Sequence, residues 1–221
     1  GLTAALSAKG FVSMAPEMPW SGRRAYDRSV DETMEDITSI AGELRRQGAT
    51  RIVVGGHSLG GAMALAYAGH IKVDGVMVIA PGHNPGAPRF RKLLGADVER
   101  ARAAVAAGKG QDIDTWSDLN TGDRVSKVKA SANAYLSYMD PDGPMNFLRL
   151  ASGLKPDTPV LWAAPTREDS SFTTLSMKGY ESLPPSPGHR RIEPDSDHLN
   201  APSRVIPEVI DWLEKIIVPT T

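Results

Sequence analysis

A serine between two glycines is the feature of this chain that most directly suggests chemistry. Residues 56–60 read Gly-His-Ser-Leu-Gly, after an apolar, β-branched stretch at 51–55 and before small residues and helix formers at 61–68. The first stretch predicts a buried strand and the second a helix. On so sharp a turn, a serine hydroxyl stands above the sheet edge, and flanking glycines are needed because a Cβ would clash. The pattern predicts that Ser58 is a nucleophile; the alternative is a glycine-rich connection with an incidental serine.

The backbone beside this serine offers a second group. The N–H of Leu59 would lie at the N-terminus of the predicted helix, where it can stabilise a developing oxyanion. A serine hydroxyl is a poor nucleophile at neutral pH, so it needs a base within hydrogen-bond reach and an acid that orients the base. A histidine and a carboxylate must therefore be found elsewhere in the chain.

With strand, motif and helix in this order, residues 56–60 resemble the nucleophile elbow of the α/β-hydrolase family. The resemblance extends over nearly the whole chain, in the order of its elements more than in residue identity. It implies a mostly parallel sheet with helices on both faces. It also implies a triad whose members occur in the order serine, then aspartate or glutamate, then histidine.

Among the five histidines, the family's order favours His198 as the base. This residue follows the last predicted strand and precedes the final helix, as the family's base does. His57 lies inside the elbow, and His70 ends the following helix. His83 comes before the candidate acids, and His189 comes before the last predicted strand.

The acid is predicted at the loop after the strand at 159–164. Aligning this strand with the family's pattern, strand then G-x-x-D, places Pro165 at the glycine and Glu168 at the acid. Glutamate is a known acid in the family and reaches about one carbon further than aspartate. Asp169, one residue on, is the alternative that we favour less. Asp140 and Asp142 are two further candidates for the acid, which we favour least.

Strands and helices alternate along the chain. The predicted strands are residues 11–15, 51–55, 75–80, 159–164 and 189–193. The predicted helices include 2–9, 29–47, 61–68 and 206–217. This alternation predicts an α/β fold with a mostly parallel sheet, in which ligands bind beyond the carboxyl ends of the strands. Because Ser58, Glu168 and His198 all follow strands, we expect them at one edge of the sheet.

The chain is predicted to form a single α/β-hydrolase domain over residues 1–221. Within it, the pattern changes from Ala87 to about Pro156, where helical pieces such as 97–107 are separated by Gly- and Asp-rich breaks. We interpret this region as a helical cap or an enlarged helical connection. The alternative is a solvated helical excursion with no role in substrate binding.

Composition excludes several classes of function. The 221 residues include 25 basic and 26 acidic side chains, for a formal net charge of -1. The sequence has no basic stripe with interleaved aromatic residues, so nucleic-acid binding is not predicted. It also has no apolar run that approaches the roughly 20 residues of a membrane span. The absence of cysteine excludes disulfides and thiolate chemistry. We predict neither cofactor nor metal; compartment and oligomeric state stay open.

The family's second oxyanion donor comes from a loop after an early strand, just before the first helix. This chain begins within what resembles that helix, so we expect the family's N-terminal strands to be absent from this sequence. Together these features predict a carboxylesterase-like serine hydrolase. It would cleave an ester or related small acyl compound through Ser58, His198 and Glu168, with an acyl-enzyme intermediate. The alternative is a non-catalytic ligand-binding or scaffold protein on the same fold.

Overall fold

A computed structural model describes residues 1–120 and 124–217. The chain divides into two compact units. The first, here called the sheet unit, contains Gly1–Ala15, Ser39–His83 and the chain from Phe147 onward. The second, the hairpin unit, contains Pro16–Thr38 and Asn84–Asn146. Helix α2 (Val30–Arg46) begins in the hairpin unit and ends in the sheet unit.

The sheet unit is built on a four-stranded sheet of order β1-β2-β5-β6, in which every neighbouring pair is parallel. The strands are β1 (Val53–His57), β2 (Gly75–Ile79), β5 (Val160–Ala163) and β6 (Arg190–Ile192). Its helices are α1 (Leu2–Ala8), α3 (Leu59–His70), α6 (Phe147–Ser152), α7 (Ser170–Glu181), α8 (Ala201–Arg204) and α9 (Ile206–Ile217). The predicted α/β fold with a mostly parallel sheet is confirmed.

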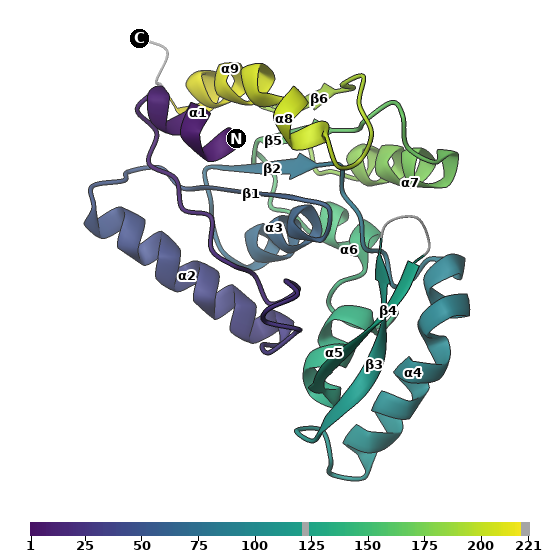
Figure 1. Ribbon diagram of the computed structural model, residues 1–221. Coiled ribbons are helices and arrows are strands. Elements are labelled where there is room, and N and C mark those ends of the chain that lie inside the picture. Colours follow the sequence, from purple (N-terminus) through teal and green to yellow (C-terminus); the bar gives the residue numbers. More distant parts are fainter. Residues whose placement is uncertain (121–123, 218–221) are drawn as a thin grey trace. The chain divides into compact units, whose positions relative to one another are not determined.

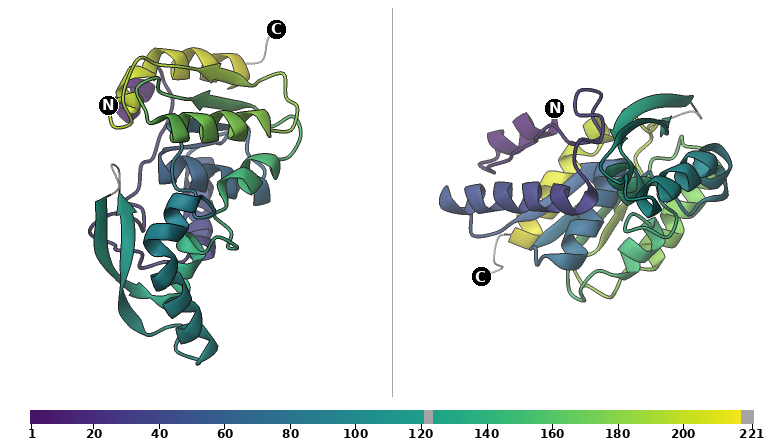
Figure 2. Two further views of the ribbon diagram at one scale, coloured as in Figure 1. Left: turned by 90° about the vertical axis from the view of Figure 1, so that its right-hand side faces the viewer. Right: turned by 90° about the horizontal axis from the view of Figure 1, so that it is seen from below.

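Helices cover both faces of this sheet, as Figures 1 and 2 show. Side chains of successive strand residues point to opposite faces. On β2, Ile79 belongs to a buried cluster with Val209 and Leu213 of α9. The neighbouring Val78 faces the other way, where an added Cβ on Gly61 of α3 would lie 3.4 Å from its side chain. The central strands are therefore buried on both faces, as parallel strands usually are.

The segment expected as the first strand is not one. Residues 11–18 have no regular secondary structure, and none of the described strands pairs with them. Val12 and Met14 leave 63% and 48% of their surface exposed. The prediction for 11–15 is wrong because apolar composition favours a strand only where a neighbouring backbone completes the ladder.

The hairpin unit contains α4 (Pro88–Ala106), β3 (Ile113–Asn120), β4 (Arg124–Ser131) and α5 (Ala132–Met139). β3 and β4 pair antiparallel, and Trp116 of β3 stacks on Tyr135 of α5 with ring centroids 5.1 Å apart. The helices of this region were expected, but the hairpin was not. Most of its side chains are polar and exposed, so its sequence lacks the alternation of apolar residues that marks a half-buried strand.

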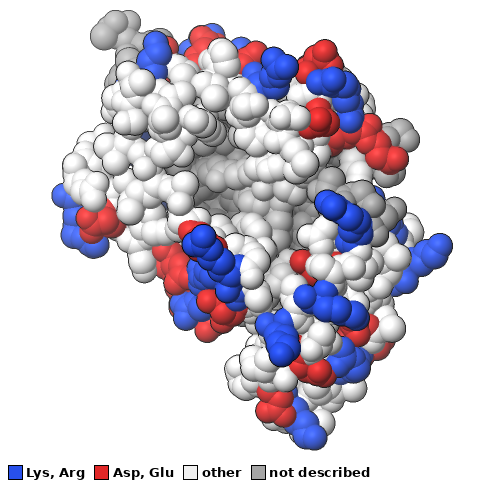
Figure 3. All heavy atoms as spheres, in the orientation of Figure 1, with Lys and Arg blue, Asp and Glu red and all other residues white. Residues whose placement is uncertain are grey.

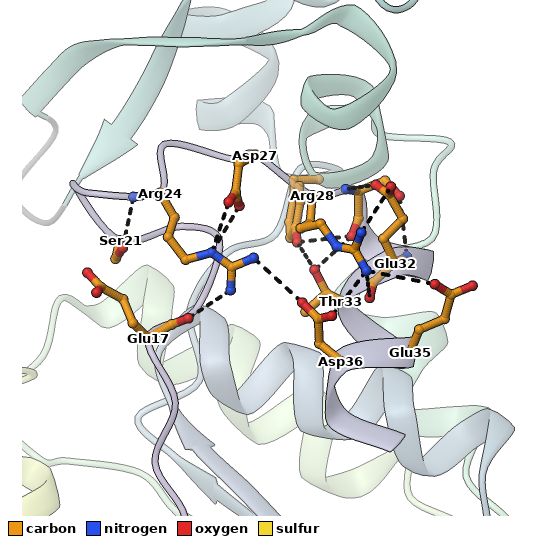
Figure 4. Close-up of polar contacts among 11 residues, drawn as sticks. Glu17, Ser21, Arg24, Asp27, Arg28, Glu32, Thr33, Glu35 and Asp36 are labelled. Atoms are coloured by element: carbon orange, nitrogen blue, oxygen red, sulfur yellow. Dashed lines mark hydrogen bonds and ion pairs between the residues drawn. The ribbon is translucent and has the colours of Figure 1, made fainter. Parts of the chain in front are cut away.

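Ion pairs tie the segment before α2 to the first turns of that helix (Figure 4). Arg24 and Arg28 both contact the Asp36 carboxylate of α2, at 3.5 Å and 3.0 Å. Ser29 and Glu32 form a capping box at the start of α2, because the Ser29 N–H donates to the Glu32 carboxylate at 2.7 Å and the Glu32 N–H to the Ser29 hydroxyl at 3.3 Å. On the face drawn in Figure 3, Lys and Arg side chains likewise lie next to Asp and Glu side chains, toward the edges of the view.

Candidate active site

Ser58 forms the whole connection between β1 and α3. β1 ends at His57 and α3 begins at Leu59, so the turn is a single residue. Ser58 has φ 56° and ψ −122°, a conformation that a non-glycine residue adopts only under strain from its surroundings. Its hydroxyl does not cap the helix that it precedes. The side chain is therefore available for other contacts.

The tightness of this turn explains why residue 56 is glycine. An added Cβ on Gly56 would lie 2.3 Å from the carbonyl carbon and oxygen of Gly60, well inside van der Waals contact. On Gly61 it would lie 3.2 Å from the Gly56 oxygen. Backbone atoms cannot move aside as a flexible side chain can, so position 56 has to be glycine.

Gly82, in the loop after β2, lies next to both Ser58 and His198. An alanine Cβ at Gly82 would lie 2.9 Å from Ser58 Oγ and 3.8 Å from His198 Cε1. The serine oxygen and the imidazole thus border the same small space, which exists because residue 82 has no side chain. A reacting carbonyl group needs such a space beside the nucleophile.

The His198 ring is held by a carboxylate. Its Nδ1 lies 2.5 Å from Oε1 of Glu168, and the two side chains are 16% and 7% exposed. A carboxylate accepts the Nδ1–H, so the neutral ring carries its free lone pair on Nε2. That atom is the one a base uses in a Ser-His-acid arrangement. Asp169, the other candidate acid, is exposed.

The pairing of β5 with β6 explains why Glu168 and His198 meet. In the sheet, Ala163 lies opposite Ile192. Three backbone N–H donors continue this pairing past the strands: Ala164 to the Ile192 oxygen (2.9 Å), Thr166 to that of Pro194 (3.1 Å) and Arg167 to that of Ser196 (3.1 Å). The two loops therefore leave the sheet side by side, and the next residues on each include Glu168 and His198.

The first turn of α3 supplies backbone donors. The Ser58 N–H donates to the Ile79 oxygen at 3.0 Å, and the Gly61 N–H to the Ser58 oxygen at 3.0 Å. Since a helix cannot pair its first N–H groups internally, those of Leu59 and Gly60 have no acceptor within α3. The N–H of Leu59 was expected in this position; that of Gly60 was not, although helix geometry alone leaves it without an acceptor in α3.

His57 makes a contact that its place in the sequence does not predict. Its Nε2 lies 2.8 Å from the backbone oxygen of His198, and the two rings lie 4.7 Å apart, tilted by 47°. Because a carbonyl only accepts, Nε2 carries the proton. Burial lowers the pKa of His57, and the neighbouring His198 lowers that pKa further. Both effects favour the neutral ring.

Other candidates have structural partners. His189 accepts from the Val160 N–H at 3.2 Å and donates to the Pro184 oxygen at 2.8 Å. In the hairpin unit, Asp140 and Asp142 both bind Arg102, at 2.5 and 2.9 Å. Within residues 1–120 and 124–217, no cluster of His, Asp or Glu side chains is arranged to hold a metal ion. None of the helices in that described part has the length and hydropathy that a membrane span requires.

Comparison with known proteins adds a family and a fold. A sequence model of the alpha/beta hydrolase family matches residues 1–211. No curated protein sequence matches the chain. The solved structure of a thermostable carboxyl esterase from Bacillus coagulans with glycerol is similar, at 14% identity and a TM-score of 0.66, over 98% of this chain and 84% of that one.

Two further solved structures are similar to this chain. DcsB in complex with its substrate analogue has 15% identity and a TM-score of 0.67, over 98% of this chain and 83% of that chain. A malate-bound esterase from Thermogutta terrifontis has 19% identity and a TM-score of 0.54, over 92% and 75%. At these identities the likeness is one of fold.

Proposed function

Because the chain belongs to the α/β-hydrolase family, we propose that it is a serine hydrolase that cleaves an ester or a related acyl compound. The observation that carries the proposal is the joint position of Ser58 Oγ and the His198 ring beside Gly82. The contact between His198 Nδ1 and Glu168 supports the same assignment. Two of the similar structures are those of esterases, which agrees with it.

In the proposed reaction, His198 Nε2 takes the proton of the Ser58 hydroxyl as its oxygen attacks the substrate carbonyl. The resulting oxyanion is stabilised by the Leu59 N–H, with that of Gly60 available as a second donor. His198 then gives the proton to the departing alcohol, which leaves an acyl-enzyme. A water molecule, deprotonated by His198, hydrolyses this ester and restores Ser58.

Glu168 has the orienting role. Its carboxylate accepts the Nδ1–H of His198, which fixes the ring and the tautomer and stabilises the imidazolium that forms during proton transfer. Because the Glu168 side chain is only 7% exposed, water weakly screens its contact with His198. These proton transfers use groups of the chain itself, so the proposed mechanism includes no cofactor.

The test of this function is turnover of a short-chain p-nitrophenyl ester by the wild type and by Ser58→Ala. We expect hydrolysis by the wild type and a loss of at least about 10³-fold in the variant. A fluorophosphonate probe should label the wild type and not Ser58→Ala, while the melting temperatures agree. Labelling that persists in Ser58→Ala would refute the assignment. Ligand binding with no turnover and no labelling would favour a non-catalytic binding protein.

A further inference from the structure

We propose that His57 is a positioning residue for the catalytic base, because its Nε2–H holds the main chain of His198 while its ring supports the His198 ring. This inference depends on the proposed function, since it assigns a role toward the same base. It goes beyond the proposed function because it assigns a role to His57, the residue between Gly56 and Ser58. The hydrogen bond from His57 Nε2 to the His198 oxygen, at the carboxyl edge of the sheet, carries this assignment.

The bond joins the end of one outer strand of the sheet to the loop that follows the other outer strand. His57 ends β1, and His198 lies in the loop after β6, which stands at the other end of the order β1-β2-β5-β6. The 2.8 Å contact from His57 Nε2 to the His198 oxygen therefore closes the carboxyl edge between non-adjacent strands. The nucleophile directly follows His57, so the same contact connects the backbones that carry nucleophile and base.

His198 is thus held from two directions. Glu168, in the loop after β5, holds ring atom Nδ1 at 2.5 Å, and His57 holds the main-chain oxygen. Fixing only the ring would let the loop shift, and fixing only the loop would let the ring turn. With both contacts made, Nε2 of His198 is the remaining ring nitrogen and is available to Ser58.

The surroundings of His57 suit a hydrogen-bond donor. A protonated ring would sit 4.7 Å from a base that becomes charged during each proton transfer, which would oppose catalysis. Burial and the nearby His198 both lower the pKa of His57, in favour of the neutral ring. Neutral His57 then has one N–H, and its contact with a carbonyl places that proton on Nε2.

The test compares side chains that keep or lose the donor. In His57→Gln, the amide nitrogen can occupy the place of Nε2, so we expect kcat within about threefold of the wild type. His57→Phe keeps a ring but has no donor, and we expect kcat to fall by about 10²-fold with KM changed less than threefold, the cost of a small misplacement of the base. Fluorophosphonate labelling should slow in parallel, because it also needs an activated Ser58. His70→Phe, at an exposed histidine that ends α3, is the control and should leave both rates unchanged.

A second pair decides the matter if His57→Phe does not fold. His57→Asn carries the same amide as His57→Gln but ends one carbon short of the His198 oxygen, so its kcat should be at least tenfold lower, about the worth of one hydrogen bond. Equal kcat in the Gln and Asn variants, or an unchanged kcat in His57→Phe, would overturn the proposal. Wild-type protein with neither turnover nor labelling would count instead against the proposed function.

Discussion

The carboxylate of Asp97 gives a stability prediction with a defined pH window. Asp97 lies on α4 and is 17% exposed in its side chain. It accepts the Ser117 N–H of β3 at 2.7 Å and contacts Arg100 at 3.0 Å and Lys127 at 3.5 Å. Burial alone would raise the pKa of Asp97, but these hydrogen bonds outweigh it and lower the pKa to about 2. The ionised carboxylate therefore joins α4 to the hairpin.

The size of this effect follows from the two pKa values. The gap between the ordinary 3.8 and about 2 corresponds to about 2 kcal/mol of stability, at about 1.4 kcal/mol per pH unit. Because the folded-state pKa of Asp97 is the lower one, the contribution is fully present above about pH 5 and is lost as the pH falls through about 2. We expect Asp97→Asn to cost up to about 2 kcal/mol at pH 7, and the difference from the wild type to shrink between pH 4 and pH 2.

Urea unfolding at several pH values, followed by circular dichroism and tryptophan fluorescence, measures this difference. Trp116 is a suitable reporter, because it lies on β3 and is 1% exposed. Asp112→Asn is the matched control, since Asp112 lies exposed between α4 and β3 and should change stability by less than about 0.5 kcal/mol. An Asp97→Asn cost that is the same at pH 7 and pH 3 would show that the reasoning is wrong.

Two further predictions concern the site. Glu168→Gln should lower kcat by about 10²–10⁴-fold, because an amide can favour the wrong His198 tautomer. Asp169→Asn should change kcat less than threefold. Loss of turnover only in Asp169→Asn would contradict the proposal that Glu168 orients His198. Gly82→Ala should lower kcat/KM by at least tenfold without lowering the melting temperature, because its Cβ would lie 2.9 Å from Ser58 Oγ. Gly95→Ala, in open space on α4, should leave activity unchanged and add up to about 1 kcal/mol of stability; equal activity of the two alanine variants would refute the crowding argument.

The sequence was most informative where short-range constraints decide the structure. The tight turn from β1 to α3 could be predicted because its geometry depends on the types of five consecutive residues, above all on glycine at 56. The loops of Glu168 and His198 could be predicted because each follows a strand of a parallel sheet. In both cases the local pattern and the fold agree, so one sequence was enough.

Longer-range pairing was beyond the sequence. The β3–β4 hairpin is stabilised by its packing on α4 and α5, which its own polar strands do not reveal. The expected strand at 11–15 failed for the converse reason, since its apolar residues find no paired backbone among the described strands. The role proposed for His57 depends on a contact across 141 residues of chain. Contacts between residues so far apart in the chain cannot be predicted from one sequence and are seen only in a structure.

The same loops explain why a glutamate suits position 168. Backbone hydrogen bonds from Thr166 and Arg167 fix the path of the loop after β5 against the loop that carries His198. With its backbone held, the residue at 168 must reach Nδ1 by side-chain length alone. An aspartate there would end one carbon–carbon bond, about 1.5 Å, short of the 2.5 Å contact, beyond hydrogen-bond range. A glutamate side chain at 168 thus matches the register of β5 and β6, since it reaches His198 Nδ1 where an aspartate side chain would not.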